Sequence, residues 1–254
     1  MSIDIRFSDV SACEADAMFA SDFTMRRLSI DTRSLQSGDT YLAIKGERFD
    51  GHDFIDNAVS AGASSLIVSS SVDTDMPVLR VRDTQVTLGN IARLYRNKLQ
   101  ARVVGITGSN GKTTVKSMVT SICAEHGVVT ATVDNNNNKI GVPLTLLSAK
   151  IDDNYVVVEM GTSELGEIAY LASIVEPDIS LITTVSESHL EGIGSRDDVF
   201  DEKSSIIPAT REDGTVIVNL DDDYSQKAIA CLLYTSPSPR DCVSNLVCRL
   251  LLEK

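Results

Sequence analysis

The apolar positions between residues 101 and 220 fall into short runs separated by stretches with a helical period. Four runs are rich in β-branched residues and alternate little with polar positions, which is typical of strands buried on both faces of a parallel sheet. These runs are 103–106, 155–160, 179–185 and 215–220. Apolar residues spaced three and four apart predict helices at 114–126, near 168–174 and near 199–207. The alternation predicts an α/β domain with a mostly parallel sheet. In the first helix, the residues expected to face the sheet are Val115, Met118, Val119 and Ile122.

The first 100 residues show the same alternation in shorter segments, which predicts a separate small α/β domain. The expected elements are strands at 39–46, 65–69 and 78–81 and helices at 54–62 and 87–99. Gly62 is placed to close the first of these helices, because glycine is common just after a helix end. We therefore expect one domain at 1–100 and a second at 101–230.

Residues 231–254 differ in character from the rest of the chain. The segments CLLYTSPSPRD and NLVCRLLLEK resemble the translation of an adapter used to prepare DNA for sequencing. Three of the five cysteines also lie here. We expect the natural sequence to be interrupted at about Ala230 and 231–254 to be a non-native tail. The alternative is a genuine C-terminal strand and helix.

Composition and charge exclude several classes of function. The chain has 23 Lys and Arg against 36 Asp and Glu, a net charge of −13, and the tail holds three basic and two acidic residues, so residues 1–230 carry −14. Nucleic-acid binding needs clustered basic residues, so we expect no nucleic-acid partner. No run approaches the roughly 18 apolar residues of a membrane span, and residues 1–7 do not resemble a secretory signal. The two cysteines before the tail have no paired spacing. We expect a cytoplasmic protein without a disulfide framework or a zinc site.

The segment RVVGITGSNGKTTVK (102–116) places a glycine-rich loop between a predicted strand and a predicted helix. Glycines let backbone N–H groups turn towards a phosphate, and the helix N-terminus adds partial positive charge. Lys112 is placed to reach the β- and γ-phosphates, and the Thr113 hydroxyl is a candidate Mg²⁺ ligand. The general motif has glycine where this chain has Ile106. The segment predicts nucleoside triphosphate binding, and the alternative is a chance glycine turn.

Polar residues follow the predicted strands, at the edge where ligands gather in such sheets. Glu159 closes the second run, and a carboxylate beside a phosphate loop is a candidate Mg²⁺ ligand. His189 follows the third run and could hold a second Mg²⁺ or orient a phosphate. By residue type alone, Lys203 is a solvated surface lysine. The four asparagines at 135–138 suit sugar or phosphate recognition, or they form a polar turn.

Taken together, these segments resemble the Mur ligases, the ATP-dependent enzymes that build the peptidoglycan precursor. TGSNGKT at 107–113 is similar to their nucleotide loop, and 30–54 is similar to their UDP-binding amino-terminal domain. The segments 135–147 and 189–195 resemble loops of the branch that joins D-alanyl-D-alanine to UDP-N-acetylmuramoyl-tripeptide. The resemblance spans 1–223. It implies a small α/β UDP-binding domain, then an incomplete P-loop-type central ATPase domain, with the family's C-terminal ligase domain absent.

The resemblance also implies a role for each matching residue. ATP would be bound by Thr107, Gly108, Ser109, Asn110, Gly111, Lys112, Thr113, Thr114, Asn219 and Asp221. The UDP-sugar peptide would be bound by Asp31, Thr32, Arg33, Lys45, Gly46, Asn135, Asn137 and Asn138. Two Mg²⁺ ions would be held by Thr113, Glu159, His189 and Lys203. The implied catalytic residues are Lys112, Glu159, His189 and Lys203, the last as a carbamylated lysine. The family usually has Gly at Asp134 and Asn at Thr184, which affects the expected substrate contacts more than ATP binding.

The implied reaction converts a carboxylate into an acyl phosphate, which the amine of D-alanyl-D-alanine then attacks. We expect a monomer, and a chain that ends inside the central domain is expected to bind substrate without ligating it. Two other interpretations stay open. One is a relative within the family, such as the ligase that adds the third amino acid or a folate-polyglutamylating enzyme. The other is a non-catalytic nucleotide-binding module.

Overall fold

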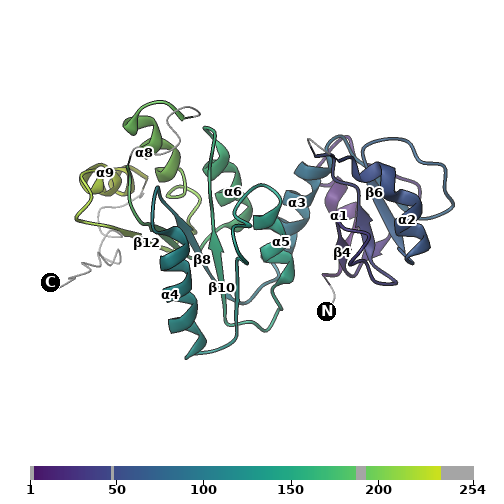
Figure 1. Cartoon of the computed structure of the whole chain (residues 1–254), viewed down its shortest axis with the longest axis horizontal. Coiled ribbons are helices and arrows are strands. Elements are labelled where there is room, and N and C mark those ends of the chain that lie inside the picture. The colour runs from purple at the N-terminus through teal and green to yellow at the C-terminus, as the bar shows by residue number, and fades with distance from the viewer. Residues whose placement is uncertain (1–2, 47–48, 187–192, 236–254) are drawn as a thin grey trace. The chain divides into compact units, whose positions relative to one another are not determined.

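The computed structural model describes residues 3–46, 49–186 and 193–235. The chain divides into two compact units, residues 1–98 and 99–254 (Figure 1). Each unit is built around a five-stranded sheet with helices packed on it. The expected α/β class is therefore confirmed in both parts of the chain.

The sheet of the first unit has the strand order β2-β7-β6-β5-β4. Its strands are β2 (Met18–Phe19), β4 (Leu28–Ser29), β5 (Thr40–Leu42), β6 (Ser65–Val68) and β7 (Val78–Arg80). Neighbouring strands are parallel except β2 and β7, which run antiparallel. A separate antiparallel pair joins β1 (Ile5–Arg6) to β3 (Thr24–Met25). The three strands predicted from the pattern are present as β5, β6 and β7, and they lie side by side.

The helices of the first unit begin and end close to the predicted positions. They are α1 (Phe7–Ser11), the 3₁₀ turn η1 (Gly51–Phe54), α2 (Ile55–Ser60) and α3 (Thr84–Arg96). The expected helix at 54–62 is present as η1 and α2, and it ends before Gly62, whose φ is +92°. The helix expected at 87–99 starts three residues earlier, because Asp83 accepts hydrogen bonds from the backbone N–H groups of Gln85 and Val86.

The sheet of the second unit has the strand order β12-β11-β8-β10-β9, and every neighbouring pair is parallel. The strands are β8 (Arg102–Thr107), β9 (Val129–Ala131), β10 (Tyr155–Glu159), β11 (Ile179–Ile182) and β12 (Thr215–Val218). The helices are α4 (Lys112–Ala124), α5 (Gly141–Ser148), α6 (Glu167–Val175), α8 (Arg196–Ser204) and α9 (Ser225–Thr235). The predicted parallel sheet is confirmed. No helix in the described ranges is long and apolar enough to cross a membrane.

The order of the strands places a topological switch point at the carboxyl end of β8. From β8 the chain passes to β9 and β10 on one side of the sheet, and then crosses to β11 and β12 on the other. Right-handed crossovers then place α4 on one face and α5 and α6 on the other, as Figure 1 shows. Ligands of open α/β sheets bind in the crevice at such a point.

Two expectations about α4 are wrong. The helix begins at Lys112 rather than Thr114, and Met118 and Ile122 are 59% and 63% exposed rather than buried. Val115 and Val119 do pack against the strands, as expected. The buried stripe is displaced because Lys116 points inward beside Val119 and is 6% exposed. A lysine at that position is not recognisable as a core residue from its type.

The structure also contains elements that the apolar pattern did not predict. β9 and α5 flank the asparagine-rich segment, and α8 begins three residues before the expected position because Ser195 and Asp198 form a reciprocal capping box. The helix α9 continues past Ala230, where the natural sequence is expected to be interrupted.

Candidate functional site

The glycine loop between β8 and α4 adopts a conformation that needs glycine at two positions. Gly108 has φ +143° and Gly111 has φ +79°. A Cβ on Gly108 would lie 1.9 Å from Oγ1 of Thr183, so the loop passes tightly over the segment that follows β11. Gly111 is the N-cap of α4, and the first turn of any helix leaves N–H groups without intrahelical partners. The loop therefore presents a helix N-terminus at the switch point, as an anion site requires.

Hydrogen bonds hold this loop to residues 183–186. The backbone N–H of Ser109 donates to the Thr184 carbonyl at 2.8 Å, and the Ser109 hydroxyl donates to the Ser186 carbonyl at 3.0 Å. The side-chain amide of Asn110 donates to the Ser186 hydroxyl at 2.8 Å, and the Thr183 hydroxyl donates to the backbone carbonyl of Asn110 at 2.6 Å. The loop is thus preorganised by a neighbouring strand end. Thr107 is buried at its start and donates to the Met160 carbonyl at 3.1 Å.

Lys112 lies across the same loop. Its Nζ donates to the carbonyls of Gly108 at 2.7 Å and Ser109 at 3.3 Å. Burial lowers the pKa of the Lys112 ammonium, while the nearby Glu159 carboxylate acts in the opposite direction. The ammonium is therefore held over the loop by two of its backbone carbonyls. Thr114 is exposed in the first turn of the helix.

Glu159, at the end of β10, is 1% exposed and lies beside this loop. Its Oε1 accepts hydrogen bonds from Thr113 Oγ1 at 3.2 Å and from Asn137 Nδ2 at 2.9 Å. Its Oε2 is a buried oxygen without a hydrogen-bond partner among the residues that the structure describes. A buried, under-satisfied carboxylate next to a threonine hydroxyl is a suitable donor set for a hard cation such as Mg²⁺.

Lys116 was not recognised from the sequence, yet it faces this carboxylate from α4. Its Nζ lies 3.4 Å from Glu159 Oε2 and donates to the Asp134 carbonyl at 3.0 Å. The side chains of Lys116 and Glu159 are 8% and 1% exposed, so the ion pair is buried. The signal available in the sequence was weak: a lysine four residues after Lys112 lies on the same face of a helix as the phosphate loop.

The asparagine-rich segment divides into residues with different environments. Asn137 contacts Glu159, as described above, and its carbonyl accepts from the Gly161 N–H at 2.8 Å. Asn138 Oδ1 accepts from the N–H groups of Ile140 and Gly141, so it stabilises the start of α5. Asn135 is exposed. The polar-turn interpretation thus holds for Asn138, whereas Asn137 contacts the Glu159 carboxylate.

Lys203 on α8 is 1% exposed, which corrects the surface interpretation based on residue type. Burial is the main cause that lowers its pKa to about 8, and the charge of Lys112 acts in the same direction. Its neighbour Glu202 has a structural role, because it accepts hydrogen bonds from the backbone N–H groups of Gly166 and Ile168 at the start of α6. Groups of three or more His, Cys, Asp or Glu side chains that could hold a metal ion do not occur in the described part of the chain.

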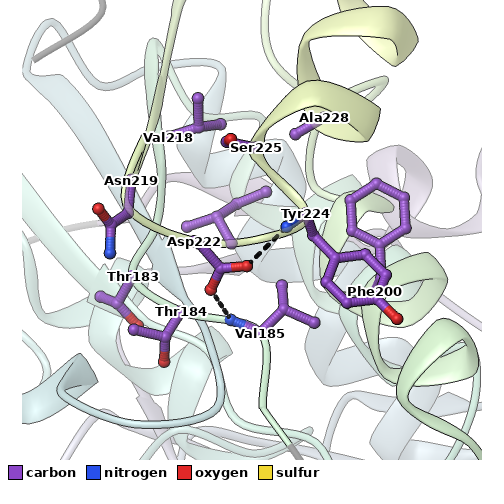
Figure 2. A pocket seen from close by; sticks show the side chains of 11 residues that line it. Thr183, Thr184, Val185, Phe200, Val218, Asn219, Asp222, Tyr224, Ser225 and Ala228 are labelled. Carbon is purple, nitrogen blue, oxygen red and sulfur yellow. Dashed lines mark hydrogen bonds between the residues drawn. The ribbon is translucent and has the colours of Figure 1, made fainter.

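A small pocket lies at the carboxyl ends of β11 and β12 (Figure 2). It has a volume of about 20 Å³, which is room for one water molecule. The carboxylate of Asp222 spans it, accepting from the N–H groups of Val185 at 2.6 Å and Tyr224 at 2.9 Å. Asn219 lines its rim, and the N–H of the exposed Asp221 donates to Asn219 Oδ1 at 3.1 Å. Of the two residues expected near the nucleotide, Asn219 therefore lines this pocket and accepts a hydrogen bond within the turn, whereas Asp221 is exposed.

The candidate UDP-site residues of the first unit lie in two groups. Arg33 forms a close ion pair with Asp31, and its hydrogen bond lowers the pKa of Asp31 to about 2. Thr32, between them, is half-buried. Lys45 lies 3.9 Å from Asp50, and the Gly46 N–H donates to the Phe49 carbonyl at 2.9 Å.

The structure thus brings together the loop residues 107–114, Glu159 and Asn137. His189, the other expected metal ligand, lies outside the described residues. The roles proposed for these residues stay predictions at this point, because geometry alone does not identify what binds.

Comparison with known proteins gives consistent matches. Residues 106–234 match the Mur ligase middle domain, and residues 24–140 match the Mur ligase family catalytic domain. UDP-N-acetylmuramoyl-tripeptide–D-alanyl-D-alanine ligase of Escherichia coli K12 is 42% identical over 80% of this chain and 45% of its own length. The Bacillus subtilis enzyme of the same name is 39% identical over the same shares. The chain spans about half the length of the curated relatives it matches.

Solved structures give the same result. A crystal structure of MurF from Acinetobacter baumannii has a TM-score of 0.81 and 32% identity, covering 89% of this chain and 51% of its own. The structure of MurF ligase from Thermotoga maritima in complex with ADP has a TM-score of 0.74 and 34% identity, covering 80% of this chain and 48% of its own.

Proposed function

Because this chain belongs to the Mur ligase family, we propose that the protein is an ATP-dependent ligase that joins D-alanyl-D-alanine to UDP-N-acetylmuramoyl-tripeptide. The reaction would be a cytoplasmic step in making the peptidoglycan precursor, on which cell shape and division depend. The relatives that share 42% and 39% identity carry this name, which supports the substrate assignment. We further propose that the protein acts as a monomer.

One observation carries the proposal most directly. One oxygen of the buried Glu159 carboxylate, Oε2, has no hydrogen-bond partner in the described residues, and the other, Oε1, accepts from the hydroxyl of Thr113, which follows Lys112, at 3.2 Å. A phosphate cradle with a neighbouring cation site is what a Mg²⁺–ATP complex requires, because Mg²⁺ binds through one or two carboxylates together with the phosphates of the nucleotide.

The proposed reaction has two steps. The terminal carboxylate of the tripeptide attacks the γ-phosphorus of ATP, which gives an acyl phosphate and releases ADP. The amine of D-alanyl-D-alanine then attacks the acyl carbon, inorganic phosphate leaves, and the amine loses a proton. Lys112 would exchange its contacts with the loop carbonyls for the β- and γ-phosphates and stabilise charge on the transferring group. Thr113, Glu159 and His189 would hold two Mg²⁺ ions, which neutralise phosphate charge when bound.

We also propose that Lys203 is carbamylated. A neutral lysine amine attacks CO₂ and loses a proton, which yields an anionic carbamate. The buried position of Lys203 supports this, because a pKa lowered to about 8 leaves more of the amine neutral at physiological pH than the ordinary value of 10.5 does. The carbamate would supply a further oxygen ligand to the second Mg²⁺.

The UDP-sugar would bind at the first unit through residues 31–33, Lys45 and Gly46. In the second unit, Asn135, Asn137 and Asn138 would contribute to substrate binding. In the second unit, Asn219 and Asp221 would lie near the nucleotide, where Asn219 lines the rim of the pocket in Figure 2. Backbone N–H groups of the loop 107–114 would surround the phosphates.

Calorimetric titration of residues 1–254 tests the proposal. We expect Mg²⁺–ADP and UDP-N-acetylmuramoyl-tripeptide to bind independently, with nucleotide binding lost in Lys112→Ala and UDP-sugar binding retained. Arg33→Ala is the matched variant, because it should lose the UDP-sugar and keep the nucleotide. Nucleotide binding without any UDP-sugar binding would favour a non-catalytic nucleotide-binding module. Ligase turnover by this chain alone would contradict the expectation that it binds without ligating.

A further inference from the structure

One buried charged group has no part in the chemistry described above. Lys116 lies on α4, one turn beyond Lys112, and its side chain is 8% exposed. Burying a lysine is costly unless the ammonium finds a charged or polar partner. Neither the phosphate loop nor the packing of α4 on the sheet calls for a cation at this position.

Lys116 contacts two groups. Its Nζ lies 3.4 Å from Oε2 of Glu159 and donates to the Asp134 carbonyl at 3.0 Å. The two contacts together hold the ammonium between the Glu159 carboxylate and the backbone carbonyl of Asp134. The other carboxylate oxygen, Oε1, is turned towards Thr113 and Asn137. The two oxygens of Glu159 therefore have separate partners, one cationic and one neutral.

We propose that Lys116 is a positioning residue: it is the internal counter-cation of Glu159, and it balances the charge of this carboxylate and fixes its orientation when no metal is bound. This inference rests on the proposed function, since it takes Glu159 as a Mg²⁺ ligand. Lys116 keeps a buried carboxylate stable when no divalent cation is present, and it opposes the cation when one arrives.

The physical reason is the balance of charge around one carboxylate. Without Lys116 or a metal ion, Glu159 would be an unpaired buried anion, and breaking a buried ion pair in this way is strongly destabilising. With Lys116 present, a divalent cation that binds Glu159 comes close to a fixed positive charge in a poorly screened environment, which weakens its binding. Removing Lys116 should therefore destabilise the metal-free protein and strengthen metal binding. A residue that only packs the core would produce the first effect without the second.

Thermal unfolding without metal tests the first effect, which is the loss of stability in the metal-free protein. We expect Lys116→Met to lower the unfolding temperature of the second unit by roughly 10 °C. The double variant Lys116→Met/Glu159→Gln should regain at least half of this loss, because it removes the unpaired charge as well. Lys139→Met is the matched control, since Lys139 pairs with Glu167 at 3.2 Å but is 39% exposed; it should shift the temperature by less than about 3 °C. A double variant no more stable than Lys116→Met would overturn the proposal.

If Lys116→Met cannot be obtained folded, the same substitution in the Glu159→Gln background decides the matter. The proposal predicts that Lys116→Met lowers the unfolding temperature of the Glu159→Gln variant by less than about 5 °C. An equal loss of roughly 10 °C with and without the carboxylate would show that Lys116 acts through packing alone and would overturn the proposal.

Metal affinity tests the second effect, with Mn²⁺ as the probe and the electron paramagnetic resonance of the free ion as the readout. In the presence of ADP, Lys116→Met should bind Mn²⁺ about tenfold more tightly than the wild type, and Lys139→Met should bind as the wild type does. Equal or weaker binding by Lys116→Met would refute the inference. If the wild type binds no Mn²⁺ with ADP, the proposed function fails instead, and the unfolding comparison still decides whether Lys116 and Glu159 act as a pair.

Discussion

Substitution of Gly108 by alanine gives the most direct test of how the phosphate loop is built. A Cβ at this position would lie 1.9 Å from Oγ1 of Thr183, and 3.0 and 3.1 Å from the N and Cβ atoms of the same residue. The backbone φ of +143° is itself unfavourable for alanine. Relief of the contact must move Thr183, whose hydroxyl donates to the Asn110 carbonyl at 2.6 Å. The substitution therefore disturbs the bonds that preorganise the loop.

The magnitude can be worked from two contributions. Forcing a non-glycine residue into a sparsely populated backbone region costs about 1–3 kcal/mol, and overpacking a tight contact costs about 1–3 kcal/mol more. Gly111→Ala is the matched control, because φ is +79° there but nothing lies within 4 Å of the added Cβ. That variant should cost only the backbone term of about 1–2 kcal/mol. We expect unfolding temperatures lower by about 10 °C for Gly108→Ala and about 3 °C for Gly111→Ala.

Thermal unfolding followed by circular dichroism measures these shifts, and titration with ADP and Mg²⁺ measures whether the loop still binds. Gly108→Ala should lose nucleotide affinity in addition to stability. Thr183→Ala removes the 1.9 Å contact, so it should reduce the cost of Gly108→Ala when the two are combined. The reasoning fails if Gly108→Ala is no more destabilising than Gly111→Ala.

Three further predictions concern charge and capping. The pKa of Lys203 is lowered to about 8 from 10.5, so the unfolded chain keeps this proton at a pH where the folded protein has lost it. The measured quantity is the free energy of unfolding of the wild type minus that of Lys203→Met, from urea titrations in CO₂-free buffer. This difference should be constant below pH 8 and rise by on the order of 3 kcal/mol between pH 8 and 10.5. A difference that does not change with pH would contradict this prediction. Glu202→Gln should destabilise the protein by about 2 kcal/mol in urea unfolding, because the oxygen of the new amide can accept from only one of Gly166 and Ile168 and the amide nitrogen cannot accept from the other; a change below about 0.5 kcal/mol would count against that role. Asp83→Ala should cost about 1 kcal/mol through the loss of the α3 cap and leave ADP affinity unchanged, which calorimetry would show.

The sequence by itself determined those elements whose residue types indicate whether they are buried or exposed. The strands β8, β10, β11 and β12 follow from β-branched runs, because a parallel sheet buries both faces of its strands. The conformation of the phosphate loop could be predicted from its glycines, and the position of Glu159 beside that loop could be predicted from its place at the end of a strand. These features depend on a few neighbouring residues, so they can be recognised without knowing the fold. The short strands β1–β4 could not, because two-residue pairings have no period to detect.

Only the tertiary structure decided which polar side chains became buried. Lys116, Lys203 and Glu202 have residue types that are usually exposed, yet none of them is more than 6% exposed, because of what surrounds each side chain after folding. Lys116 meets Glu159 across 43 positions of chain, and Glu202 reaches the start of α6 from α8. The spacing of apolar residues along the chain indicates on which face of its own helix or strand a residue lies. It carries no information about which distant group lies opposite, and that distant group determines whether a charge can be buried.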